Sequence, residues 1–261
     1  MGESLVSKEF LKRTESKEYF RMHPDINVVK IGGQSIIDRG RKVVLPILDE
    51  LIEARQTHKL VIATGGGTRA RHAYAIATDL GMPTGVLAKL GSSISEQNAL
   101  MVAILLTPHG GIKIGHDDLP KLAAYMSLGI LPVTHAMPPY GLFERPPALG
   151  RIPPHRTDVG AILLAEVMGA ARCFLVKDER GLFTADPKKD PGARFIPEIE
   201  ANELLALDLE DLAVERSMLE VLRDARSLRE VFIVNGLEHG NITRALAGEN
   251  VGTRIYVNRD A

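Results

Sequence analysis

Short apolar runs alternate with glycine-rich loops and amphipathic stretches in the first half of the chain. Residues 28–31 (VVKI) and 60–63 (LVIA) each precede a cluster of glycines, which predicts buried strands that enter loops. Over residues 43–52, apolar side chains recur at i, i+1, i+4, i+5 and i+8, the spacing of one helical face. This alternation predicts an α/β fold with a mostly parallel central sheet and helices on both faces.

The rest of the chain continues the same alternation. Strands are expected at 130–134, 173–176, 231–234 and 254–257, and helices at 74–80, 95–106, 161–168 and 242–246. Gly81 is expected to end the second helix as a C-cap. Cys173, the only cysteine, falls on an expected strand, so we interpret it as a core residue rather than a nucleophile.

One stretch breaks the pattern. Residues 135–157 read HAMPPYGLFERPPALGRIPPHRT, with many prolines and glycines among histidines, arginines and aromatic residues. Because proline fixes φ and removes a backbone donor, we expect an ordered irregular loop here. Loops of this length in compact domains are uncommon and are often functional.

The amino-terminal residues 1–24 are mostly charged and polar and lack the apolar core of a signal peptide. We expect a peripheral helix or arm there, ending near His23-Pro24, and one domain over residues 25–261. No stretch approaches the ~20 apolar residues that a membrane helix needs. The sequence therefore predicts a cytoplasmic protein without a membrane partner.

Composition narrows the function classes. The 261 residues are 45% hydrophobic and 25% charged, with a formal net charge of −1, which argues against a globally basic nucleic-acid binder. Tryptophan is absent and aromatic residues make only 5%, which weakens a base-stacking role. A single cysteine excludes an intrachain disulfide and a zinc cluster of several thiolates.

Two glycine loops are candidates for phosphate binding. Lys30 stands just before Gly32 and Gly33, and the residues 65–67 (GGG) are followed by Arg71. Glycines let backbone N–H groups approach an anion closely, and a nearby lysine adds positive charge. Each loop alone also fits a structural turn, and neither GxxxxGK[ST] nor GxGxxG occurs.

Taken together and in order, several motifs are more specific. They are KIGG (30–33), TGGG (64–67), TDVGA (157–161), GLFTADP (181–187), NGL (235–237), GNI (240–242) and GT (252–253). This series resembles the amino-acid-kinase family, in particular its uridylate-kinase branch. The resemblance implies a three-layer α/β/α fold that binds ATP without a Walker loop.

The same resemblance implies roles for single residues. Lys30 would contact the transferred phosphate, and Asp158 would either cap a helix or orient lysines near the phosphates. Phe183 and Asp186 would lie on the adenosine side, although Asp186-Pro187 also fits a plain turn. The implied catalytic residues are Lys30 and Asp158, and the implied ATP-binding residues are Lys30, Gly32, Gly33, Gly65, Gly66, Gly67, Arg71, Lys177, Gly181, Phe183, Asp186 and Pro187.

Three departures from a working uridylate kinase, one of them just before the ATP loop, together argue against a pyrimidine acceptor. The segment 90–94 (LGSSI) has no acid where the family has an aspartate that reads the uridine ribose. Residues 179–181 (ERG) replace Val-Asp-Gly, and 214–217 (VERS) replaces a Met-Asp stretch. The pattern favours ATP binding with a non-nucleotide anion as the second ligand.

Further segments resemble the molybdenum-storage branch of the family: IDRG (37–40), TRARH (68–72), MPPY (137–140), RTD (156–158) and TRALAGE (243–249). This implies Mg²⁺-ATP hydrolysis that deposits molybdate or tungstate as polyoxometalate clusters inside a hexameric cage. Where one subunit type of that branch has tyrosine, this chain has His155, as in the other type. A homo-hexamer and a hetero-hexamer with a homologous subunit both remain open.

Oxide clusters suit imidazoles, backbone amides and basic side chains. The predicted cluster contacts are His155, His135 and Arg156, with His109 and His116 upstream, although each histidine also fits a solvated loop. The acids Asp208, Glu210, Asp211, Glu215 and Glu220 are interpreted as a solvated helix face. The alternatives to oxoanion storage are a uridylate-type kinase and an ATP-binding regulatory protein without catalysis.

Overall fold

The computed structural model describes residues 20–170 and 172–258. Its strands are β1 Ile26–Ile31, β2 Lys59–Thr64, β3 Gly111–Lys113, β4 Leu131–His135, β5 Arg172–Lys177, β6 Leu182–Phe183, β7 Phe195–Ile196, β8 Glu198–Glu200, β9 Glu230–Asn235 and β10 Thr253–Tyr256. Its α-helices are α2 Arg41–Ala54, α3 Gly67–Asp79, α4 Thr84–Leu105, α5 Leu122–Ser127, α6 Thr157–Met168, α7 Ala201–Ala206, α8 Arg216–Asp224 and α9 Asn241–Leu246. These elements confirm the alternation read from the sequence.

Within these described residues, eight strands form one sheet in the order β3-β4-β2-β1-β5-β9-β10-β8. All neighbours in it are parallel except β9 and β10, which run antiparallel. Strands β6 and β7 pair separately. The expected mostly parallel α/β fold is therefore confirmed.

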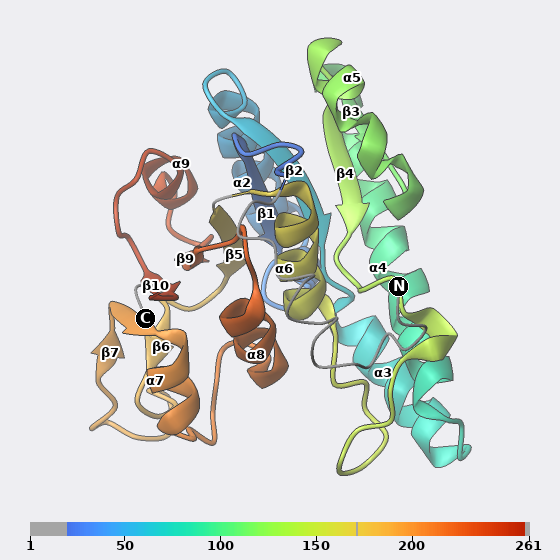
Figure 1. Cartoon of the computed structure of the whole chain (residues 1–261), viewed down its shortest axis with the longest axis vertical. Helices are drawn as coiled ribbons and strands as arrows, with labels where there is room; N and C mark the ends of the chain where they lie inside the picture. The colour runs from blue at the N-terminus through green and yellow to red at the C-terminus, as the bar shows by residue number, and fades with distance from the viewer. Residues whose placement is uncertain (1–19, 171, 259–261) are drawn as a thin grey trace, which may run out of the picture.

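Helices cover both faces of the sheet (Figure 1). The strand residues Val29 and Ile31 belong to the core that contains α2 and α9, whereas Val28 belongs to the core that contains α6 and α8. Alternate side chains of a strand point to opposite faces. The two buried faces of β1 thus explain its nearly continuous apolar sequence and the three-layer arrangement.

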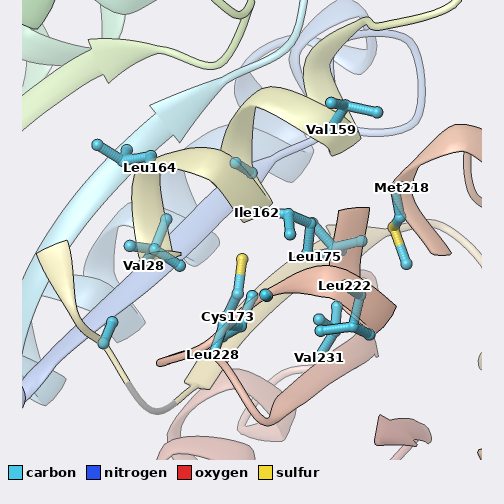
Figure 2. Close-up of a cluster of buried hydrophobic side chains, with 14 of the residues drawn as sticks. Val28, Val159, Ile162, Leu164, Cys173, Leu175, Met218, Leu222, Leu228 and Val231 are labelled. Atoms are coloured by element: carbon cyan, nitrogen blue, oxygen red, sulfur yellow. The ribbon is translucent and has the colours of Figure 1, made fainter. Parts of the chain in front are cut away.

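Cys173 lies inside the α6 side of the core, surrounded by side chains from β1, α6, α8 and β9 (Figure 2). Its side chain is fully buried and unpaired by any disulfide. Burial, followed by the nearby Asp158 charge, raises the pKa of the Cys173 thiol far above its ordinary value. These surroundings agree with the core role expected for it.

The helix expected at 95–106 is longer, because α4 begins at Thr84. Gly85 and Gly91 interrupt the helical pattern of its first half, so the sequence did not predict that half. A Cβ atom at Gly85 would lie 2.8 Å from the carbonyl carbon of Leu142, and one at Gly91 would lie 2.8 Å from Cζ of Tyr74. These glycines serve close packing of α4 against its neighbours, not a turn.

Residues 135–157 form the expected irregular segment, which holds a short 3-10 turn at Gly141–Phe143 between β4 and α6. Of the arm expected at 1–24, residues 1–19 lie outside the described residues. The described remainder contacts the end of α6, where Arg21 Nε donates to Gly169 O at 2.7 Å. None of the described helices is long and apolar enough to cross a membrane.

Candidate functional site

A cleft of about 920 Å³ opens at the carboxyl ends of β1, β2 and β5. Sites at this edge are typical of parallel sheets. Its lining includes residues of both glycine loops, Arg71, and the lysines Lys30, Lys177 and Lys188. Residues 212–215 form part of its wall.

Strand register brings two lysines together in this cleft. Lys30 pairs with Leu175 across β1 and β5, so Lys177, two residues further along β5, points to the same face. That face is covered by α6, whose second residue is Asp158. Lys30 Nζ lies 2.9 Å from Asp158 Oδ1, and Lys177 Nζ lies 2.8 Å from Asp158 Oδ2.

We call Lys30, Asp158 and Lys177 the lysine–aspartate group. Burial alone would raise the pKa of Asp158, but the charges of Lys177 and Lys30 outweigh burial and hold this pKa well below its ordinary value. Asp158 therefore remains an anion that fixes both ammonium groups. The sequence left two roles open for Asp158, as a helix cap or as a residue that orients lysines. In the structure its carboxylate contacts both lysines.

The two glycine loops lie directly against each other. A Cβ atom at Gly33 would lie 2.6 Å from Cα of Gly67. The amides of Gly32 and Gly65 donate to the carbonyls of Val176 and Ile31, each at 3.0 Å, and so continue the sheet. The amides of Gly33, Gly66 and Gly67 are not engaged by other described residues, which leaves them as the donors available to an anion.

Replacement of Gly33 by alanine is expected to destabilise the protein by about 1–3 kcal/mol, because the added methyl group would overlap the backbone of the second loop. Urea unfolding measures this loss. Gly115→Ala is the matched control, since its Cβ would meet nothing closer than an Asp118 oxygen at 3.7 Å. Equal stability of the two variants would contradict the packing described here.

Glu215 corrects a sequence-based prediction. We expected it on a solvated helix face, yet its side chain is 9% exposed and lines the cleft. Its carboxylate accepts hydrogen bonds from the backbone N–H groups of Arg156, Asp158 and Val159 at 3.0, 3.1 and 3.3 Å. Residues 208–211 also precede α8 rather than forming part of it.

Five of the predicted nucleotide-binding residues do not line this cleft: Gly65, Gly181, Phe183, Asp186 and Pro187. The Phe183 ring packs against Phe195 with 5.5 Å between centroids. The Asp186 carboxylate accepts the backbone N–H of Lys188 at 2.9 Å, as a turn would. Lys188 itself lines the cleft and is paired with Glu179.

The predicted cluster contacts have separate surroundings. Arg156 lines the cleft, with its Nε atom 3.7 Å from Glu215. His155 Nδ1 lies 2.9 Å from the buried carboxylate of Glu144. Because a carboxylate only accepts hydrogen bonds, the proton of the neutral ring is on Nδ1. The Nε2 atom then has a free lone pair with which it can bind a metal.

His135, at the end of β4, lies beside His116, with 4.3 Å between ring centroids. His135 Nδ1 is buried and has no hydrogen-bond partner among the described residues. Burial, assisted by the charge of His116, lowers the pKa of His135 from 6.5 to about 4. At neutral pH it is therefore an uncharged imidazole.

This lowered pKa predicts a pH dependence of stability. The unfolded chain takes up a proton near pH 6.5 and the folded chain only near pH 4, so the free energy of unfolding falls as pH drops through this window, by about 3 kcal/mol at most. Urea unfolding between pH 7 and 4 measures it. His135→Gln should flatten the curve, and His72→Gln, at an exposed position, should not; identical curves for both would contradict the burial effect.

No cluster of three or more histidine, cysteine or acidic side chains in the described part of the chain could hold a metal ion. The cleft acids are already engaged: Asp38 accepts the amide of Thr68 at 2.6 Å, and Asp178 and Glu179 pair with Arg39 and Lys188. A Mg²⁺ ion usually takes only one or two carboxylates and completes its shell with phosphate oxygens and water. Asp178 and Glu179 line the cleft, and either one would hold Mg²⁺ in exchange for its contact with Arg39 or Lys188.

The structure is thus that of an α/β protein whose mostly parallel sheet carries a cleft lined by lysines and glycine loops. The sequence model of the amino acid kinase family matches residues 25–235. The chain therefore belongs to the amino acid kinase family, which confirms the resemblance read from its motifs.

Individual relatives refine this placement. The chain is 49% identical over 255 residues to molybdenum storage protein subunit beta of Azotobacter vinelandii, covering 98% of this chain and 94% of that protein. It is 32% identical over 244 residues to uridylate kinase of Thermofilum pendens, covering 87% and 96%. The solved uridylate kinase of Archaeoglobus fulgidus superposes with a TM-score of 0.69 at 22% identity, covering 88% and 99%, and so shares the fold.

Proposed function

We propose that this protein stores molybdenum, binding Mg²⁺-ATP in the cleft and depositing molybdate or tungstate as polyoxometalate clusters inside an oligomeric cage. The observation that carries the proposal is the 49% identity to molybdenum storage protein subunit beta over nearly the whole chain. A proposed cytoplasmic location fits this function. The relative's name identifies it as one subunit of an assembly, which supports a hexamer built from this chain alone or with a homologous subunit.

The cleft offers the chemistry that ATP hydrolysis needs. Lys30 and Lys177 point at one region from two strands and are held there by Asp158. Two fixed ammonium groups neutralise charge on a phosphoryl group during its transfer, and amides of a glycine loop add donors. When bound, Mg²⁺ would be held by Asp178 or Glu179 and would offset negative charge on the phosphates.

A uridylate kinase is the second candidate, supported by relatives such as the one from Thermofilum pendens. The acceptor side argues against it. Residues 90–94 lie within α4, and Gly91 lines the cleft where the family resemblance calls for an acid nearby. This region gives a ribose no carboxylate to bind.

ADP release distinguishes these functions from each other and from an ATP-binding regulator. Under the storage proposal, ATP is converted to ADP and phosphate with molybdate present, and UMP neither accelerates the reaction nor becomes UDP. UDP formation would support the kinase instead. ATP binding without any ADP release would support the regulatory protein and overturn the hydrolysis step.

A further inference from the structure

Among the residues that the structure describes, three glutamates make the same kind of contact. Each places one carboxylate on three backbone N–H groups that are distant in sequence. Glu50 receives those of Gly240, Ile242 and Thr243; Glu166 those of Arg226, Ser227 and Leu228; Glu215 those of Arg156, Asp158 and Val159. Glu50 and Glu166 can therefore serve as comparisons for Glu215 within the same protein.

Glu215 differs from the other two in what it touches. It binds the start of α6, where Asp158 holds both lysines of the cleft. The amide of Asp158 donates to Glu215 Oε1 at 3.1 Å, and the amide of Glu215 donates back to Asp158 Oδ2 at 3.3 Å. Backbone and carboxylate of Asp158 are therefore both fixed by one residue.

We propose that Glu215 is a positioning residue, which sets the Asp158 carboxylate so that it meets Lys30 and Lys177 together. For its effect on hydrolysis, this inference rests on the proposed ATP-hydrolysing function. Glu215 is joined through residues 212–214 to the cleft wall. It thereby ties this wall to the lysine–aspartate group.

The contact requires a carboxylate. Both oxygens of Glu215 are used, one by Asp158 and the other by Arg156 and Val159. Glutamine has one acceptor oxygen, and its NH₂ group would face N–H donors. Keeping two acids side by side is unfavourable, since burial and then the Asp158 charge raise the pKa of Glu215. The charge of Arg156 and the N–H group of Asp158 offset part of this effect.

Glu215→Gln tests the proposal, with Glu166→Gln and Glu50→Gln as matched controls. All three variants lose the same kind of buried contact, and similar losses of thermal stability are expected. Two further measurements distinguish a positioning role of Glu215 from a purely structural one. One is the kinetics of ATP hydrolysis, and the other is the rate at which methyl acetimidate amidinates Lys30 and Lys177, followed by mass spectrometry.

We expect Glu215→Gln to lower kcat about tenfold with little change in KM, because fixed geometry acts on the chemical step. Amidination of Lys30 and Lys177 should accelerate in Glu215→Gln and stay unchanged in both controls. Equal lysine reactivity in all three variants would overturn the inference. The amidination test needs no activity, so absent hydrolysis in the wild-type protein would refute the proposed function without deciding this inference.

Discussion

Lys30→Ala is expected to reduce ATP hydrolysis about 100-fold or more, the usual cost of removing a preorganised donor from a reacting oxyanion. The Lys30 side chain is only 5% exposed and is fixed by Asp158 at the end of β1. Alanine removes the charge, and water or a mobile lysine cannot replace it in the same place. Steady-state ADP release measures the loss.

The control for this variant is Lys59→Ala. Lys59 starts the neighbouring strand β2, pairs with Asp25, and is 57% exposed at the opposite edge of the sheet. We expect its removal to leave hydrolysis unchanged. Full activity of Lys30→Ala would contradict the assignment of the cleft, and thermal unfolding of both variants identifies a loss due to misfolding alone.

His155→Ala is expected to lower molybdenum content about tenfold, the scale seen when a metal site loses a well-oriented partner, and to leave ATP affinity unchanged. The Glu144 carboxylate fixes the proton on Nδ1, so Nε2 is the nitrogen offered to a metal-oxide edge. Neither His155 nor Glu144 lines the cleft proposed to bind ATP. Metal analysis by mass spectrometry and ATP titration measure the two properties separately.

His58→Ala, near the amino-terminal edge of β2, is the control and should retain its molybdenum. Undiminished metal content in His155→Ala would remove His155 from the cluster contacts. A parallel fall of metal content and ATP affinity would instead indicate a damaged fold.

Much of the fold could be predicted because buried parallel strands leave a strong local signal. The apolar runs at 28–31 and 60–63 end where β1 and β2 end, at glycines. The amino-terminal half of α4 could not be predicted, since its glycines reflect contacts with Tyr74 and Leu142. Short edge elements such as β3 and β8 carry too few residues to show a period.

The candidate site was predictable only in part, for a related reason. Lys30 and Lys177 follow apolar strand residues, so their place at the sheet edge is visible in the sequence. Glu215 lies in the segment 214–217 that replaces the family's Met-Asp stretch, but this gave no sign of its contact, because the amide that it binds at Asp158 lies 57 positions earlier. In the sequence it is one acid among several, and only tertiary contact distinguishes it from a solvated one.

Molybdenum content per chain, measured after incubation with molybdate with and without ATP and removal of free oxoanion, tests the storage function most directly. Storage as oxide clusters predicts several metal atoms per chain with ATP and far fewer without it. A content of one atom or fewer per chain under both conditions would contradict molybdenum storage by this protein.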